Sequence, residues 1–144
     1  MSTTRLPLGT FIGARSGDKG GDANVGLWVV DPVEPAAVAL AQGRAAELAV
    51  GEPATRLADA RYAWLAELIT PAAVAELLPE AQGLAVEVHH LPNLRAINIV
   101  IHGLLGRGVA ETTRVDPQAK GLGEHVRARL VDVPDALLGD GVTT

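Results

Sequence analysis

The 144-residue chain contains no cysteine, and only 3% of its residues are aromatic although 48% are hydrophobic. The absence of cysteine excludes disulfide bonds, thiolate chemistry and cysteine-ligated metals, and it agrees with a cytoplasmic setting. Because aromatic side chains are so few, the core must be built from alanine, valine, leucine and isoleucine. A chain of this length and composition is expected to form one domain with a substantial hydrophobic core.

An excess of basic residues is also missing, since the formal net charge is −5. Nucleic acid is therefore not an expected partner. An anionic ligand would need a local group of cations, so the positions of individual lysines and arginines are informative. No apolar run is long enough to span a membrane, and the N-terminus lacks the apolar segment of a signal peptide. We therefore expect a cytoplasmic protein without a membrane partner.

The most distinctive segment is residues 15–24 (RSGDKGGDAN), which combines three glycines with two carboxylates and two cations. The flanking residues 8–14 and 23–30 are apolar and are predicted to form strands. The connection between them is then too long for a two-residue hairpin turn. A glycine-rich loop of this kind can present backbone N–H groups to an anion, with lysine and arginine adding positive charge.

The two aspartates of this segment, Asp18 and Asp22, suit a divalent cation such as Mg²⁺, a hydroxyl group or proton transfer. A polar loop whose aspartates only cap turns and pair with Lys19 explains the composition equally well. The segment fits no phosphate-loop or dinucleotide-binding pattern. The candidate catalytic residues here are Asp18, Lys19 and Asp22, and the candidate binding residues are Arg15, Ser16, Gly20, Gly21 and Asn24.

The rest of the chain alternates between patterns typical of helices and strands, which predicts an α+β sandwich with helices over one face of a largely antiparallel sheet. Further strands are predicted over 84–90 and 108–115, and helices over 59–69 with Asp59 as N-cap, from Thr70-Pro71 to 78, over 93–105 and from Asp116-Pro117 onward. The predicted organisation is a flexible leader (1–7), one α+β domain (8–133) with an insertion-like helical segment (33–58), and a flexible tail (134–144).

Four later polar residues are further candidates. In the predicted helix over 93–105, Arg95, Asn98 and His102 lie at spacings of three and four beside an apolar arc, either lining a cleft or facing solvent. Lys120 falls in the first turn of the last predicted helix, where a lysine is unfavourable unless an anion binds there. His102 is a candidate catalytic residue, and the other three are candidate binding residues.

No metal site is predicted from the adjacent histidines. His89 and His90 fall in the predicted strand over 84–90, where neighbouring side chains point to opposite faces. They cannot easily bind one metal ion together, and His90 shares the apolar face, where a histidine is more often a packing residue than a ligand.

Residues 14–24 (ARSGDKGGDAN) resemble the signature of the acyclic terpene utilisation protein A family. The resemblance is to its small ferredoxin-like domain, which is C-terminal in longer members and also occurs as a free-standing chain. It covers about residues 8–131, and segment 33–58 departs from the pattern. Further along the chain, the following segments also agree with the family's sequence pattern: YAWL (62–65), LPNLRAIN (91–98), HGLLG (102–106) and DPQAKGLGE (116–124).

The resemblance implies a ferredoxin-like two-layer fold and a place in the bacterial catabolism of branched or terpenoid acids carried as coenzyme A thioesters. Two functions remain open. The first is an enzyme or enzyme subunit that binds an acyl-CoA or another anionic carboxylated ligand at the glycine-rich segment. The second is a non-catalytic binding or oligomerisation module that partners a larger subunit of the family. A homo-oligomer is expected in either case.

Overall fold

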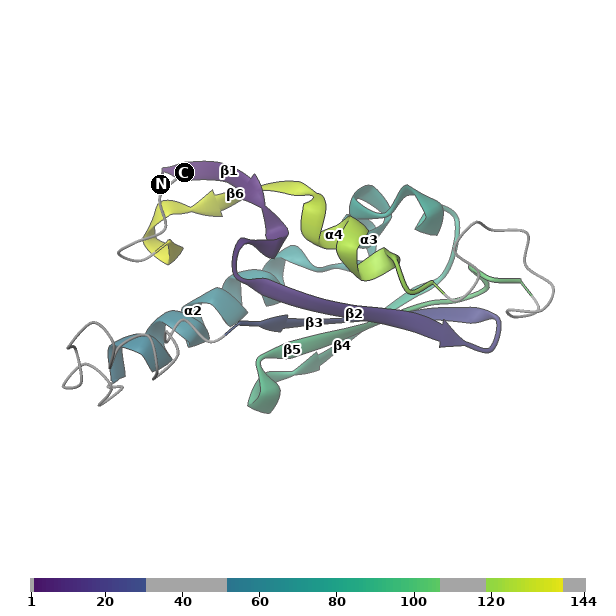
Figure 1. Ribbon diagram of the computed structural model, residues 1–144, viewed down its shortest axis with the longest axis horizontal. Helices are drawn as coiled ribbons and strands as arrows, with labels where there is room; N and C mark the ends of the chain where they lie inside the picture. The colour runs from purple at the N-terminus through teal and green to yellow at the C-terminus, as the bar shows by residue number, and fades with distance from the viewer. Residues whose placement is uncertain (1, 31–51, 107–118, 139–144) are drawn as a thin grey trace, which may run out of the picture.

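The computed structural model describes residues 2–30, 52–106 and 119–138. In this part of the chain a four-stranded antiparallel sheet has the order β2-β3-β5-β4, and a two-stranded sheet pairs β1 with β6 (Figure 1). The arrangement is α+β, as the sequence predicts. No described helix combines the length and apolarity needed to cross a membrane. The elements are β1 (Thr3–Pro7), β2 (Ile12–Lys19), β3 (Asp22–Val29), α2 (Glu52–Leu68), α3 (Pro71–Leu77), β4 (Val86–Leu91), β5 (Ala96–Ile101), α4 (Leu122–Ala128) and β6 (Leu130–Pro134).

The glycine-rich segment is a hairpin and not a long loop. Strand β2 runs to Lys19, which pairs with Asp22 at the start of β3, so Gly20 and Gly21 alone form the turn. Gly20 has a φ of +66°, a conformation that glycine adopts without strain and that short hairpin turns require. The predicted long connection is therefore wrong. Because residues 15–19 belong to a strand, their side chains alternate between the two faces of the sheet.

The helix predicted over residues 93–105 is also wrong, because the middle of this segment forms β5, one of the two central strands of the sheet. Ile97, Ile99 and Ile101 are each at most 1% exposed and alternate with residues on the other face. β-Branched side chains favour a strand, and β3 and β4 pair with β5 on its two sides. The apolar residues of this segment fit a helical spacing too, which is why periodicity alone misassigned it.

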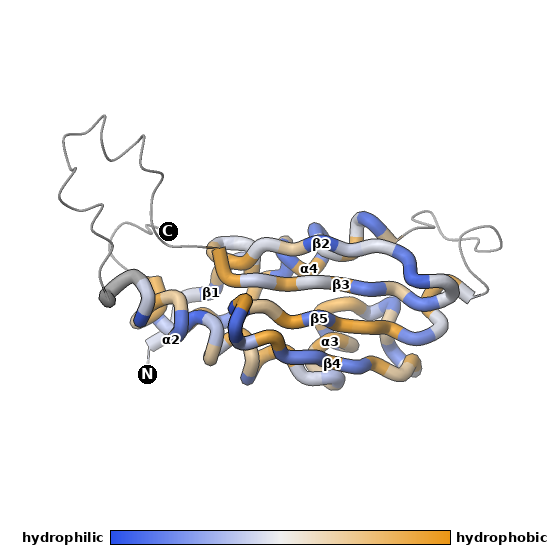
Figure 2. Tube along the Cα trace, turned by 90° about the horizontal axis from the view of Figure 1, so that it is seen from below, coloured by the Kyte–Doolittle hydropathy of each residue, from blue (hydrophilic) through white to orange (hydrophobic). Residues whose placement is uncertain are grey.

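The described helices cover one face of the four-stranded sheet and leave its other face open, as Figures 1 and 2 show. Strand β4 confirms the predicted alternation, since Val86 and Val88 are half-buried and Glu87 and His89 are exposed. Helix α3 begins after the predicted cap, Thr70, whose hydroxyl accepts a hydrogen bond from the Ala73 amide at 3.1 Å.

Helix α2 begins well before the predicted N-cap. Asp59 lies inside α2 and accepts a hydrogen bond from Arg95, so it does not cap the helix. Residues 52–58 of the predicted insertion belong to α2, and its remaining residues lie outside the described part of the chain. The predicted strand over 108–115 and the predicted helix start at Asp116-Pro117 also lie outside it.

Both ends of the described chain are folded where a leader and a tail were predicted. Residues 3–7 form β1 and pair with β6 over its whole length. After β6, residues 135–137 form a short 3₁₀ helix whose end is held by Arg61 of α2. Arg61 is 4% exposed, donates to the Leu137 carbonyl at 2.9 Å, and places its guanidinium 4.3 Å from the centre of the Phe11 ring. The flexible-leader and flexible-tail predictions therefore fail for residues 3–7 and 134–138.

Candidate functional site

The uncovered face of the four-stranded sheet, which we call the open face, carries most of the polar candidates. Directly paired residues of neighbouring strands point to the same side, so the strand register defines rows across the sheet. Figure 2 shows this face without a covering layer of described helices. Arg15 and Asn98 share one of the two inner rows. From one end to the other, the rows are Gly13, Trp28, Ala96, Leu91; Arg15, Gly26, Asn98, His89; Gly17, Asn24, Val100, Glu87; and Lys19, Asp22, His102.

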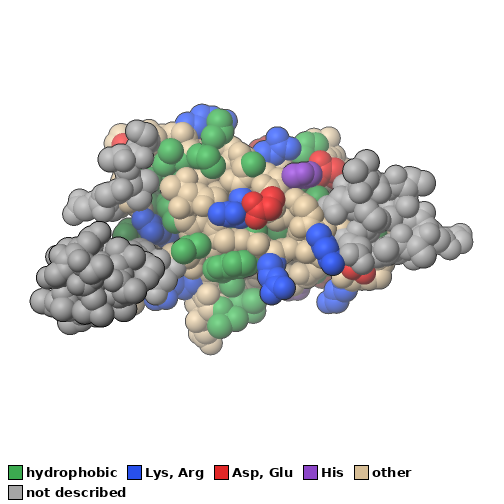
Figure 3. All heavy atoms as spheres, viewed as in Figure 1, with side chains coloured by type: hydrophobic (Ala, Val, Ile, Leu, Met, Phe, Trp, Pro, Cys, Tyr) green, Lys and Arg blue, Asp and Glu red, His purple; other side chains and the backbone are tan. Residues whose placement is uncertain are grey.

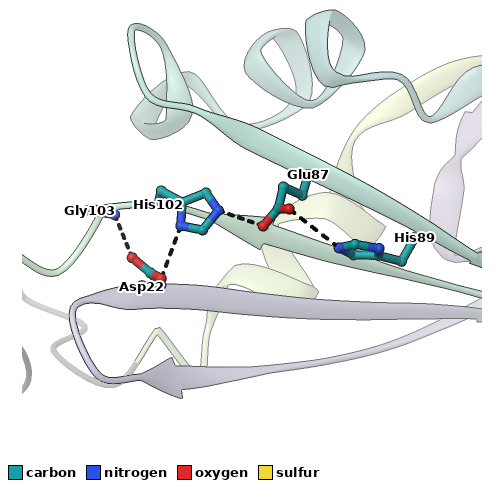
Figure 4. A network of polar contacts seen from close by, with 5 residues as sticks. All are labelled: Asp22, Glu87, His89, His102 and Gly103. Carbon is teal, nitrogen blue, oxygen red and sulfur yellow. Dashed lines mark hydrogen bonds and ion pairs between the residues drawn. The ribbon is translucent and has the colours of Figure 1, made fainter.

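At the charged end of the open face, His102 lies between two carboxylates (Figure 4). Its Nδ1 is 3.0 Å from Oδ2 of Asp22, and its Nε2 is 2.6 Å from Oε2 of Glu87. The other oxygen of Asp22 accepts a hydrogen bond from the Gly103 amide at 2.8 Å. The hydrogen bonds to Glu87 and then Asp22 raise the pKa of His102, and the Gly103 amide is the main cause that lowers the pKa of Asp22.

This arrangement fits an imidazolium that ties together β3, β4 and the turn after β5. A histidine with both ring nitrogens facing carboxylates donates two hydrogen bonds when protonated. Neither nitrogen is left to take a proton from a substrate unless one of these bonds breaks. The catalytic role of His102 stays a prediction, and in this geometry its two contacts hold the three segments together.

We expect the stability contributed by His102 to fall as the pH rises. Because its folded pKa is raised above 6.5, its contribution is complete below that pH and is lost as the pH rises through the folded pKa. The unfolding free energy of the wild type, measured by urea titration from acid to alkaline pH, should decline relative to His102→Gln. His90→Gln is the control and should follow the wild type. Parallel curves for wild type and His102→Gln would contradict this prediction.

Next to this network, three polar side chains of the open face have no partner. Among the described residues, Arg15, Asn24 and Asn98 form no side-chain hydrogen bond or ion pair. Arg15 is exposed and the two asparagines are half-buried. A guanidinium and two amides that are not needed by the fold are available to an external ligand.

Two strand glycines leave the backbone uncovered beside these polar groups. A Cβ added at Gly17 would meet nothing within 4 Å, and one added at Gly26 would meet only the Arg15 carbonyl at 3.8 Å. Neither glycine has a positive φ. Glycine inside a strand costs roughly 0.5–1 kcal/mol relative to alanine, and it often marks a place where another molecule or backbone approaches closely. Nothing in the described chain itself explains these two glycines.

Ser16, a binding candidate, and Asp18, a catalytic candidate, lie on the other side of β2 from Arg15 and Lys19. The Ser16 hydroxyl accepts a hydrogen bond from the Gly123 amide at 2.8 Å, so it anchors α4 against the sheet. Asp18 is exposed, and its position in β2 directs it away from the face that carries Lys19 and Asp22. Asp18 and Asp22 therefore cannot share a cation, and no cluster of His, Asp or Glu among the described residues is arranged to hold a metal ion.

Arg95 lies away from the open face, and Lys120 comes before helix α4. Arg95 has a φ of +46°, sits before the start of β5 at the opposite end from His102, and donates to Asp59 at 2.7 Å. Lys120 is not in the first turn of a helix, because α4 begins only at Leu122 and packs on the covered face. Gly20 and Gly21 form the hairpin turn, where the Gly21 carbonyl accepts from the Leu105 amide at 2.9 Å. The structure thus brings together Arg15, Lys19, Asp22, Asn24, Asn98 and His102, and not the full predicted set.

The described hollows lie elsewhere on the molecule. One hollow of about 640 Å³ lies among α3, α4 and β6, away from the open face, and is lined in part by Arg5, Glu76 and Arg129. Figure 3 looks along the sheet from its edge, and on this side of the molecule basic side chains have a few acidic ones among them. Sequence reasoning missed Glu87, His89 and Trp28 as members of the open face. The alternation of β4 already separated its two faces, but the strand register was needed to place them beside Asn98 and His102.

Comparison with known proteins identifies the family. No curated protein and no solved structure matches the chain. Residues 6–132, which include every described strand of the four-stranded sheet, match the AtuA ferredoxin-like domain. The match confirms the resemblance seen in the sequence, and the antiparallel sheet with its helices agrees with a ferredoxin-like fold. The chain belongs to the AtuA ferredoxin-like domain family.

Proposed function

We propose that the chain is a binding subunit that holds a small anionic, carboxylated metabolite on the open face. The observation that supports this most directly is the group of unpartnered side chains, Arg15, Asn24 and Asn98, around the bare backbone of Gly17 and Gly26. The catabolism of branched or terpenoid acids that the family name suggests supplies ligands of this class, as free acids or as coenzyme A thioesters.

The chemistry of the open face matches such a ligand from one end to the other. An arginine binds carboxylate or phosphate oxygens through two parallel hydrogen bonds, and amide side chains can orient a neighbouring carbonyl. The adjoining row is apolar, with Trp28 36% and Leu91 43% exposed. We propose that the anionic group binds at Arg15 and that the acyl chain extends toward Trp28 and Leu91.

The proposal assigns binding, and not catalysis, to this chain. Both nitrogens of His102 are engaged by carboxylates, and Asp18 lies on the other face of the sheet from Lys19. A general base would need a free lone pair within hydrogen-bonding reach of the substrate. The reaction itself is therefore expected from a larger protein of the family, with this chain as its binding partner.

A thermal-shift titration tests the binding function. The wild type is titrated separately with a branched-chain acyl-CoA, with coenzyme A alone and with the free branched acid. A ligand present at about 100 times its Kd stabilises the folded state by about 2.7 kcal/mol, so binding should be visible as a shift in Tm. We expect a rise in Tm with at least one of them, which Arg15→Met abolishes. Arg5→Met is the matched control, because Arg5 is exposed and pairs with Asp132 on the small sheet. No shift with any of the ligands, or an equal shift in Arg15→Met, contradicts the proposal.

A second function, docking to a larger protein of the family, is favoured by a separate observation. Leu94, at the turn between β4 and β5, is 70% exposed and lies near the apolar row of Trp28 and Leu91. Exposed apolar side chains gathered at one place are typical of protein–protein interfaces. Co-expression with a larger family protein, followed by gel filtration, should give a complex that Leu94→Asp weakens. A wild-type chain that elutes alone contradicts this function.

A further inference from the structure

The open face is complementary to itself. It divides into one half formed by β2 and β3 and another formed by β5 and β4. The first half has glycine at 13, 17 and 26, and the second half has no glycine among the residues of its rows. The Trp28 ring lies over Gly13, but the space over Gly17 and Gly26 is open, and the corresponding residues of the other half, Glu87 and Asn98, are larger. This is the pattern expected when a surface packs against a copy of itself through a twofold axis.

A twofold axis parallel to the strands, midway between β3 and β5, makes the correspondence explicit. Two such faces would pack with their strands nearly aligned and about 10 Å apart. Strand β2 then lies over β4 of the second copy, and β3 lies over β5. Each row faces itself in reverse. Gly17 faces Glu87 of the second copy, Gly26 faces Asn98, and Trp28 faces Ala96.

The charges follow the same correspondence. Glu87 of the second copy is placed over Gly17, between the flanking cations Arg15 and Lys19 of β2. Asp22 faces His102 of the second copy, so an acidic residue meets a basic one on both sides of the axis. An axis across the strands would instead place the Trp28 row over the charged row of Asp22, which buries charges against apolar groups.

We infer that a second copy of this chain covers the open face. Four strands about 4.8 Å apart give a face about 19 Å wide, so the buried area falls at the lower end of specific interfaces and the dimer should dissociate on dilution. One facing pair, Arg15 and His89 of the second copy, brings together two side chains that can both donate hydrogen bonds. In this respect alone the inference rests on the proposed function, because an anionic ligand bound between them would accept hydrogen bonds from both and place the second copy's residue in the site.

The first test is the mass in solution, measured by sedimentation velocity without ligand over a range of concentrations. We expect the 14.9 kDa chain to reach twice that mass at high concentration. Gly26→Arg should remain monomeric and folded by circular dichroism, because its Cβ meets no atom closer than 3.8 Å within the chain. Leu130→Arg, which removes an apolar side chain exposed on the small sheet, is the control and should still dimerise.

The second test uses the absence of cysteine, which makes site-directed cross-linking specific. In the double variant Arg15→Cys with His89→Cys, the two thiols lie on opposite edge strands of one chain but face each other across the proposed dimer. Because the packed faces are about 10 Å apart, a short bismaleimide should give a covalent dimer with the double variant and little with either single variant.

The possible outcomes separate the alternatives. A wild type that stays monomeric at every concentration overturns the inference, and so does a dimer that Gly26→Arg leaves intact. A monomer that binds a larger family protein, and loses it on Gly26→Arg, assigns the open face to that protein and also overturns the inference. The mass is measured without ligand, so failure to dimerise and failure to bind an acyl-CoA are independent results.

Discussion

Ile99→Ala is expected to lower the free energy of unfolding by about 2–5 kcal/mol. Ile99 is 1% exposed in the central strand β5 and belongs to the core cluster between the sheet and the helices. Truncation removes buried methyl and methylene groups and leaves a cavity that the paired strands on both sides cannot easily close. Since a domain is typically stable by only about 5–15 kcal/mol, urea denaturation should show a large shift of the midpoint.

The neighbouring residue provides the matched control. Val100 is 7% exposed but lies on the open face, outside the core cluster. Val100→Ala, measured at a concentration where the chain is monomeric, should therefore cost clearly less than Ile99→Ala. Equal losses, or a larger loss for Val100→Ala, would contradict the assignment of the two faces of β5.

The second large effect is expected for Gly123→Val, at the start of α4. A Cβ at this position would lie 3.2 Å from the Ala14 Cβ, which is tighter than about nine in ten real contacts, and 3.4 Å from the Arg15 amide nitrogen, and the further methyl groups of valine add to this crowding. We expect α4 to shift away from β2 by a few tenths of an ångström and to strain the hydrogen bond from the Gly123 amide to Ser16. Overpacking typically costs about 1–3 kcal/mol, and the hydrogen bond adds about 1 kcal/mol. Thermal unfolding should show a lower Tm.

Two variants separate the causes of that loss. Ser16→Ala removes the hydrogen bond without overpacking and should cost only about 1 kcal/mol. Gly17→Val adds the same side chain as Gly123→Val, but in β2 next to Ser16 and on the open face, where nothing lies within 4 Å of the added Cβ. Because valine favours strands, this variant of the monomer should be neutral or more stable. If Gly123→Val unfolds like the wild type, close packing of α4 on β2 is not required.

Local signals in the sequence were sufficient to predict the elements whose conformation depends mainly on residues nearby in the chain. The Thr70 cap with Pro71 predicted the start of α3, and the alternation around Glu87 predicted both faces of β4. The motif at residues 14–24, with the later matching segments, pointed to the family that the match over residues 6–132 confirms. The same glycines led to the wrong loop, because glycine inside a strand and glycine in a loop look alike until the pairing of Lys19 with Asp22 is known.

The site could be predicted only in part because it depends on strand register. Asn98 and His102 were chosen for their spacing on a helix. They share a face for another reason: side chains alternate along β5, and His102, directly after the strand, is four residues from Asn98. Arg95 fitted the helical spacing equally well but sits in a left-handed conformation bound to Asp59. The carboxylate partners of His102 come from β3 and β4, and no local pattern in the sequence connects these two strands.

The pairing of β1 with β6 has a consequence for how the protein is made. The Thr4 hydroxyl binds Asp135, a residue 131 positions later in the chain. During synthesis β1 leaves the ribosome well before β6, so the small sheet cannot close until β6 has been made. The four-stranded sheet and its helices can form earlier, and joining the two ends then completes folding.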